Sequence, residues 1–251
     1  MIELLASLEG KVRRQTMARI WAIFERAYPF SYLGSKFTFS SDKDLDRQVN
    51  ALLLALADEI LADIRDTTIR DVDEEDRNAV IAFAMRAING RDVTERVDSH
   101  ASRIKYLLEG YIAVCFANGF SEADILGNTS RFLSEPNTWP PMRDAFANAD
   151  EYKSGHIRSR GFHFGRGFDL DPIKGLILVV ATSVNAGWQY NAVLGYRRNG
   201  NVIGYRIHRG SDYDCAVCDE LCATVHPLDE IVLPAHPHCV CYTTPVMAGE
   251  I

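Results

Sequence analysis

The sequence predicts a mainly α-helical protein with a small α+β zinc-binding module at its C-terminal end. Apolar residues recur at three- and four-residue steps through most of the first 150 residues, which is typical of amphipathic helices. Two short β-prone segments follow residue 200. Five of the six cysteines fall within the last 40 residues. The chain has 251 residues, of which 47% are hydrophobic and 24% charged, so it is long enough to bury a core.

The N-terminal part is expected to consist of helices. Apolar spacing predicts a first helix over residues 1–28, where Pro29 and then Gly34 interrupt the pattern. Ser41 is expected to cap the next helix, because Asp42 and Asp44 then fall at its start and apolar residues follow at helical steps as far as residue 64. Further helices are predicted over residues 74–88, 93–118 and 121–133, the second of these ending at Gly119.

A change of composition near residue 150 predicts the domain organisation. Three prolines within residues 135–142 indicate a loop, and residues 148–171 are polar and rich in glycine. We therefore expect a helical domain over 1–150, a Gly/Arg/aromatic linker over 151–171 and a C-terminal domain over 172–251. The linker alternates arginine with phenylalanine and histidine. That pattern fits a basic-aromatic strip that contacts nucleic acid or a partner, but a solvated loop with a few tucked aromatic rings is the favoured interpretation.

The C-terminal domain is expected to begin with a long helix. Pro172 suits the first helical position because its missing N–H would have no helical partner there. The apolar pattern ends near Asn199-Gly200. Residues 202–209 and 240–246 are then predicted to form strands on either side of the cysteine-rich segment.

The cysteine-rich segment predicts a structural zinc site. Cys215 and Cys218 form a C-x2-C pair, and His236 and Cys239 form an H-x2-C pair, with Cys241 two residues further on. Each pair can supply one edge of a tetrahedron, and three thiolates with one imidazole make a closed zinc set. Thiolates also favour zinc over magnesium or calcium. The expected ligands are Cys215 and Cys218 first, then Cys239 and His236, with Cys241 as a replacement for Cys239.

Other interpretations of the same segment stay open. Cys222, His226 and His238 lie close enough in sequence to compete as ligands. The cysteines could also be reduced without metal, or hold an iron–sulfur cluster, although the well-placed histidine disfavours the cluster. Cys115 stands apart in an apolar helix and is expected to be a core residue.

A catalytic role for the site is the alternative to a structural one. Catalytic zinc keeps an open position beside a general base, and the candidates for a base or a nuclease histidine are Glu220, Asp229, Glu230, His208 and His238. The zinc deaminase and H-E-x-x-H patterns are absent, as are nucleotide-binding and nucleophile-elbow motifs. The sequence therefore predicts a protein without enzymatic activity, with a zinc-dependent nuclease or an injected effector enzyme as the runner-up.

Net charge and hydropathy indicate which classes of partner the chain is not expected to bind. The formal net charge is −7, which argues against strong nonspecific DNA binding by the whole chain. The most apolar run, residues 176–181, is far shorter than the roughly 20 residues of a membrane-spanning helix. The N-terminus also lacks the basic-then-apolar order of a secretory signal, so we expect a protein that has no membrane partner and is made in the cytoplasm.

The C-terminal third resembles the phage Mu F-like minor head protein family, also called phage head morphogenesis proteins. The resemblance lies in the stretches ATSVNAGWQYNAVLGY, GYRIHRGSDYDCAVC and HPHCVCYTTPV. The last is the most specific, since His236, Pro237, Cys239, Cys241 and Pro245 follow the family order. The chain departs from the family at Thr182 and Val184, where the family often has Arg and Glu, at Tyr205 in place of Trp, and at Val240 in place of Arg.

The resemblance implies a minor structural protein of a tailed-phage head. Such a protein would lie in the capsid interior or at the portal vertex of the virion, and in the host cytoplasm during assembly. It would assist head assembly or DNA packaging and delivery, with the portal or the major capsid protein as partner and packaged DNA as a further contact. The family commonly has a helical N-terminal region, which is thought to contact the portal.

Overall fold

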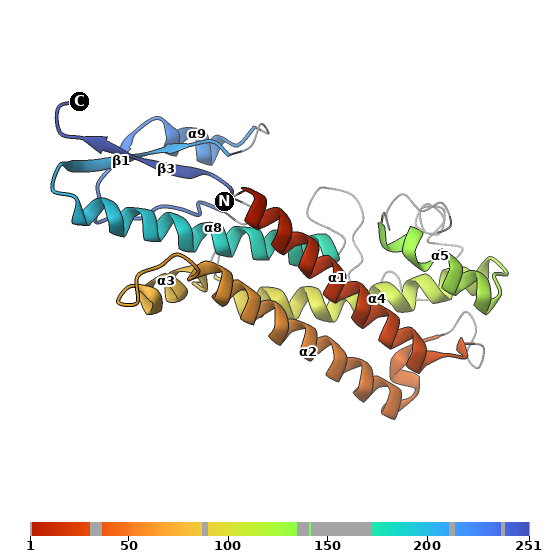
Figure 1. Cartoon of the computed structure of the whole chain (residues 1–251). Coiled ribbons are helices and arrows are strands. Elements are labelled where there is room, and N and C mark those ends of the chain that lie inside the picture. The colour runs from red at the N-terminus through yellow and green to blue at the C-terminus, as the bar shows by residue number, and fades with distance from the viewer. Residues whose placement is uncertain are drawn as a thin grey trace. The chain divides into compact units, whose positions relative to one another are not determined.

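A computed structural model describes residues 2–30, 37–86, 90–134, 141, 172–210, 214–236 and 239–250. The predicted fold class is confirmed: the described residues are mainly helical, with a three-stranded antiparallel sheet near the C-terminus (Figure 1). No helix in these ranges combines the length and the apolar character that a membrane crossing needs. The predicted linker over 151–171 lies outside the described residues.

The helices and strands follow the predicted order with three additions. The N-terminal elements are α1 (Ile2–Ala27), a 3-10 helix η3 (Phe39–Ser41), α2 (Lys43–Thr68), α3 (Arg77–Ala84), α4 (Val93–Ala117) and α5 (Glu122–Ser134). The C-terminal elements are α8 (Pro172–Arg198), β1 (Val202–His208), α9 (Ala216–Cys222), β2 (Val225–His226) and β3 (Tyr242–Met247). The short η3, α9 and β2 were not predicted, and α3 is shorter than the expected helix over 74–88.

The caps of two helices test the sequence analysis. The prediction that Ser41 caps α2 is wrong, because Ser41 belongs to η3 and the Asp42 carboxylate accepts from the backbone N–H groups of Asp44 (2.9 Å) and Leu45 (3.1 Å). The helix predicted over 121–133 is observed as α5, which begins at Glu122, and Ser121 caps it. Its hydroxyl accepts from the N–H of Asp124, whose carboxylate accepts in turn from the N–H of Ser121.

The chain divides into two compact units that differ from the predicted domain ranges. Unit 1 comprises residues 1–11, 58–97 and 177–251, and unit 2 comprises residues 12–57 and 98–176. The predicted boundary near residue 150 does not coincide with this division. The physical reason is that the segments 1–11 and 58–97 form one compact unit with residues 177–251.

Unit 2 has an aromatic core. Phe24, Phe30, Phe37 and Phe39 are fully or almost fully buried, and successive rings meet edge to face, with centroids 5.1–6.1 Å apart. Tyr111 adds a buried stacked pair with a phenylalanine of α5 and donates its hydroxyl to a backbone carbonyl. These contacts stabilise unit 2.

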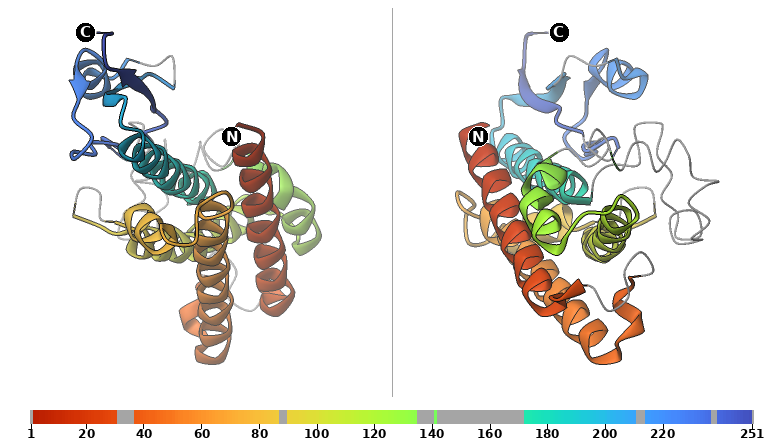
Figure 2. Two further views of the ribbon diagram at one scale, coloured as in Figure 1. Left: turned by 60° about the vertical axis from the view of Figure 1, so that its left-hand side comes forward. Right: turned by 90° about the vertical axis from the view of Figure 1, so that its right-hand side faces the viewer.

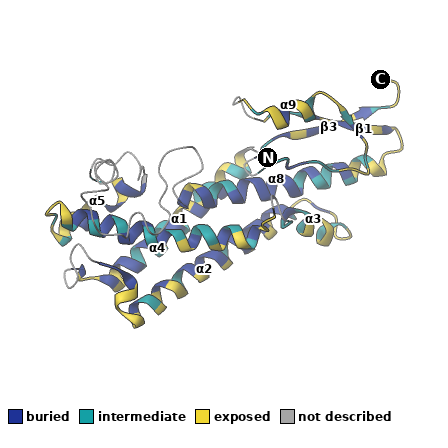
Figure 3. Cartoon of the chain, turned by 180° about the vertical axis from the view of Figure 1, so that it is seen from behind, coloured by how far each residue is buried: buried dark blue, intermediate teal, exposed yellow. Residues whose placement is uncertain are grey.

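Unit 1 is built around α8. Its residues 179–187 are buried without interruption, so this helix is covered on all sides rather than along one stripe (Figure 3). Gly187 makes the close packing possible, because a Cβ there would stand 2.2 Å from the Thr68 methyl and 3.2 Å from the Ala84 methyl. On the same helix Tyr190 stacks on Phe83 of α3, with ring centroids 4.4 Å apart.

The sheet of unit 1 has the strand order β2-β1-β3, with both pairs antiparallel. Tyr205 of β1 faces His226 of β2, and Ile207 faces Thr243 of β3. Figures 1 and 2 both show β1 and β3 beside the C-terminal end of α8, with α9 close to the strands. The buried face of the sheet therefore meets α8, where Val193, Tyr205 and Ile207 share one core cluster with three of the cysteines.

Candidate metal centre

The candidate metal centre lies where α9 meets the segment that precedes β3. Cys215 is the N-cap residue of α9, and Cys218 falls in the first turn of that helix. The C-x2-C spacing therefore places both sulfur atoms at one helix end. Cys239 and Cys241 lie just before β3 in alternate positions, and His236 precedes them. Because β3 is hydrogen-bonded to β1 over six residue pairs, the sheet fixes where this segment runs.

The structure brings all five predicted ligands together. Their donor atoms form two groups, in each of which all atoms lie within 4.8 Å of one another: Cys215 with Cys218 and His236, and Cys218 with Cys239 and Cys241. The His236 Nε2 atom is 3.3 Å from the Cys215 sulfur and 3.1 Å from the Cys218 sulfur. Cys218 belongs to both groups and so stands at the centre of the constellation. This cluster of thiols and imidazole could hold a metal ion.

Three sulfur atoms of the cluster are buried close together. Cys218, Cys239 and Cys241 are at most 2% exposed. Burial raises the pKa of Cys218 well above its ordinary value, and the neighbouring Cys241 and Cys239 raise it further. Burial also raises the pKa of Cys239. Several thiolates this close together would need a positive charge among them, which a metal ion bound to the cluster could supply.

Hydrogen bonds from backbone N–H groups favour the thiolate form of Cys215 and, against the opposing effect of burial, of Cys239. Hydrogen bonds from the backbone N–H of Cys218 and Val217 lower the pKa of Cys215, helped by the charge of Arg209. The Arg209 guanidinium itself pairs with Asp219 of α9. The Cys239 sulfur is bonded to the backbone N–H groups of Ala235 and Cys241, which partly oppose the effect of its burial.

Several residues that the sequence offered as competitors do not join the cluster. Cys222 is half-buried one turn after Cys218 and belongs to neither group of donors. His226 stacks on Tyr205 and lies 2.8 Å from the Leu221 carbonyl oxygen. His208 stacks on Tyr242 and is 2.8 Å from the Thr244 hydroxyl. His238 lies outside the described residues.

The candidate general bases also lie apart from the donors. Glu220, Asp229 and Glu230 are exposed, and no carboxylate of the described residues belongs to either donor group. The described donor set is thus made of sulfur and imidazole nitrogen alone. Such a set holds a metal tightly but provides no proton acceptor of its own.

Sequence reasoning missed the polar residues of α8 that support the cluster. The Asn185 side-chain amide donates to the carbonyl oxygens of Cys241 (3.0 Å) and Cys239 (3.5 Å). Gln189 donates to the Asn185 side-chain oxygen and accepts from the backbone N–H and the hydroxyl of Thr243. The available signal was a pair of amides one turn apart, at positions 185 and 189, in a mainly apolar stretch of the helix.

A glycine also shapes the centre. A Cβ on Gly210 would stand 1.9 Å from the carbonyl oxygen of Val240, the residue between Cys239 and Cys241. Only a residue without a side chain lets the end of β1 approach the ligand segment this closely.

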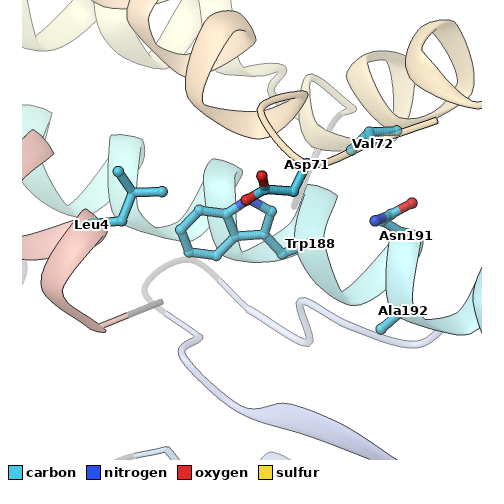
Figure 4. Close-up of a pocket in the computed structure, with 6 residues that line it drawn as sticks. All are labelled: Leu4, Asp71, Val72, Trp188, Asn191 and Ala192. Carbon is cyan, nitrogen blue, oxygen red and sulfur yellow. The ribbon is translucent and has the colours of Figure 1, made fainter. Parts of the chain in front are cut away.

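A pocket of about 280 Å³ lies elsewhere in unit 1. Its lining comes from α1, the segment after α2, and α8, as labelled in Figure 4: Leu4, Asp71, Val72, Trp188, Asn191 and Ala192. It contains no cysteine or histidine, so it is separate from the metal centre.

Cys115 lies far from this chemistry in sequence and environment. It is fully buried in α4, as its apolar surroundings predicted. Burial raises the pKa of Cys115 to about 12. A thiol in this state is unreactive near neutral pH.

Comparison of the chain with known proteins adds no relative: no family model, no curated protein and no solved structure matches it.

Proposed function

We propose that the chain is a minor structural protein of a tailed-phage head, located near the portal, whose C-terminal part is held together by a structural zinc ion. The observation that carries the zinc assignment is the donor set of Cys215, Cys218, His236, Cys239 and Cys241 in two groups that share Cys218. The phage assignment rests on the resemblance of the C-terminal third to phage Mu F-like minor head proteins.

The distances within the cluster suit zinc. Zinc holds sulfur at about 2.3 Å and imidazole nitrogen at about 2.0–2.1 Å, which separates tetrahedral ligand atoms by about 3.5–3.8 Å. The separations of His236 from the Cys215 and Cys218 sulfurs, 3.3 and 3.1 Å, differ from this by a few tenths of an ångström. In this proposal Cys215, Cys218 and His236 supply three donors and either Cys239 or Cys241 supplies the fourth, which closes the two groups that share Cys218 onto one ion. The ion would then have no open site.

A structural zinc ion would stabilise the C-terminal part, whose sheet and helix α9 are small. One of its three strands has only two residues, and α9 has seven. Elements this short bury little apolar surface by themselves, and small modules commonly use a metal in place of a larger core. In this proposal the zinc ion supplies no chemistry beyond holding α9 to the segment before β3, and the helices offer the surface for the portal or the major capsid protein.

The experiment that tests the phage assignment is quantitative peptide mass spectrometry of gradient-purified particles from the source strain. We expect the chain in the particles at a few copies per head, or in a ratio to the portal protein that is close to one. Absence from particles, together with abundance in the lysate, would overturn the assignment to the head.

The zinc staple is tested in the same system by complementation. A Cys218→Ser chain should fail to support DNA-filled heads, because Cys218 belongs to both donor groups. A Cys222→Ser chain, altered one turn along the same helix and outside both groups, should support them. Metal-dependent cleavage of DNA or RNA by the purified chain would instead favour the nuclease or effector function.

A further inference from the structure

We infer that Asn185 and Gln189 of α8 are positioning residues of the metal centre, which fix the register of residues 239–243 and so decide where the Cys239 and Cys241 sulfurs lie. This inference rests on the proposed zinc site but adds residues that touch no metal. Both amides lie on the buried helix at the core of unit 1, one helical turn apart.

The two amides bond the ligand segment in a regular pattern. Asn185 donates to the carbonyl oxygens of Cys239 and Cys241, and Gln189 accepts from the backbone N–H of Thr243 at 2.8 Å. Residues 239, 241 and 243 are alternate residues, whose backbone groups point to the same side of an extended chain. In a sheet, these backbone groups would be hydrogen-bonded to a neighbouring strand. Here the side-chain amides of α8 take the place of that strand.

The spacing of the helix matches the spacing of the segment. Four helical residues rise about 6 Å, and two residues of an extended chain span about 6.7 Å. Amides at positions 185 and 189 can thus meet alternate backbone groups of an extended segment without distortion. A shift of that segment by one residue would turn its side chains to the opposite face and take both sulfurs away from Cys218.

The network is closed, which makes it rigid. Gln189 donates to the Asn185 side-chain oxygen at 3.1 Å, and the Thr243 hydroxyl donates to Gln189 at 3.0 Å. Asn185, Gln189 and Thr243 are all buried, at 4%, 2% and 9% exposure. In such surroundings an amide that loses its partner becomes a buried polar group without a hydrogen bond, which is costly. The observed arrangement of the three side chains is therefore favoured over arrangements that break these bonds.

The test is a cobalt titration of the full chain, followed by competition with zinc. Asn185→Leu keeps the approximate volume and removes both bonds to the ligand segment. Losing a partner that orients a metal ligand typically weakens binding tenfold to a hundredfold, and we expect that loss here. Gln189→Leu leaves the Asn185 donor in place and should cause a smaller loss. We also expect the thiolate-to-cobalt absorption band of Asn185→Leu to shift or weaken, because one sulfur is misplaced.

Ser183→Ala is the matched control. Ser183 is buried on the same helix, but its hydroxyl donates to the Val179 carbonyl of that helix at 2.9 Å. Its loss should leave the cobalt affinity within about twofold of the unaltered chain. If Asn185→Leu is unfolded without metal, the midpoint of its cobalt-driven refolding, read by circular dichroism, gives the same comparison.

The outcomes separate this inference from the proposal on which it rests. An unaltered chain that binds neither cobalt nor zinc would overturn the zinc site itself. An unaltered chain that binds one ion, with an Asn185→Leu chain of equal affinity and spectrum, would overturn the positioning role alone. Equal losses in Asn185→Leu and Ser183→Ala would also overturn it, because the effect would then belong to α8 as a whole.

Discussion

Removing the metal should unfold unit 1 at a markedly lower temperature and leave unit 2 folded. The described donors all lie in unit 1, where they join α9 to the segment before β3, and Cys218, Cys239 and Cys241 are almost fully buried. Unit 2 contains none of these donors and is held by its aromatic core. The effect of a chelator should therefore appear in one of two thermal transitions.

The size of the shift follows from linkage. An ion at a free concentration 1,000 times its dissociation constant stabilises the folded state by about 4.1 kcal/mol. In a cooperative unit of somewhat over 100 residues, each kcal/mol moves the midpoint by about 4 °C. We therefore expect a chelator to lower the midpoint of the unit 1 transition by about 16 °C, as measured by scanning calorimetry with and without saturating zinc.

Two cysteine variants make the assay specific. Cys218→Ser removes the donor that both groups share, so its midpoint with zinc should match that of the chelated chain. Cys222→Ser alters the same short helix outside both groups and should keep the full zinc effect. Identical midpoints with zinc and with chelator would refute the reasoning, and so would a loss of the zinc effect in Cys222→Ser as large as in Cys218→Ser.

Three further changes test other parts of the structure. Gly210→Ala places a methyl group against the Val240 carbonyl and should cost about 1–3 kcal/mol of unfolding free energy in urea, together with weaker zinc binding, whereas Gly200→Ala has open space and should cost far less. Tyr205→Phe removes the hydroxyl that donates to the Glu230 carbonyl at 2.7 Å and should cost about 1–2 kcal/mol in the same assay; an unchanged urea midpoint would contradict this. Cys115 has its pKa raised by burial from 9.0 to about 12, so the folded chain holds this proton more tightly than the unfolded chain. The contribution of Cys115 to the free energy of unfolding is present below pH 9 and is lost as the pH rises, by roughly 1 kcal/mol at pH 10. Cys115→Ala should therefore make the fall of the unfolding free energy between pH 8 and 10 shallower by about that amount.

Helical periodicity carried most of the fold prediction, because an amphipathic helix has a sequence signature that depends only on its own residues. The helices α1, α2, α4, α5 and α8 begin and end within a few residues of the predicted ranges. Short elements have no such signature. The two residues of β2 exist as a strand because Val225 and His226 pair with β1, and that pairing depends on residues twenty positions away.

The division into units could not be predicted for a related reason. Residues 179–187 are buried on every side, so their sequence shows no polar face that would tell which segments cover them. The covering segments come from distant parts of the chain, as the contact of Gly187 with Thr68 and Ala84 shows. The change of composition near residue 150 shows only that the local sequence is polar and rich in glycine. It does not indicate which distant segments pack together.

The ligand pattern was predictable because metal donors come in characteristic spacings, whereas the choice among neighbouring donors depends on packing. Histidine at 226 was a reasonable competitor by sequence distance, and only the structure shows its ring stacked on Tyr205. Cys239 and Cys241 remained alternatives in the sequence, and both lie within the donor group that contains Cys218. The supporting amides carry no metal-ligand signature, because their partners are backbone groups.

The composition of the donor groups bears on the choice between a structural and a catalytic metal. A hydrolytic metal site needs a coordination position left for water and an acceptor for its proton. The described groups offer four sulfur donors and one imidazole nitrogen, one donor more than a tetrahedral zinc ion requires, and they include no carboxylate. In the proposed site, where Asn185 and Gln189 hold the segment that carries Cys239 and Cys241, a surplus sulfur would close the last position. This donor set is the basis on which we propose a structural ion that excludes water rather than a catalytic one.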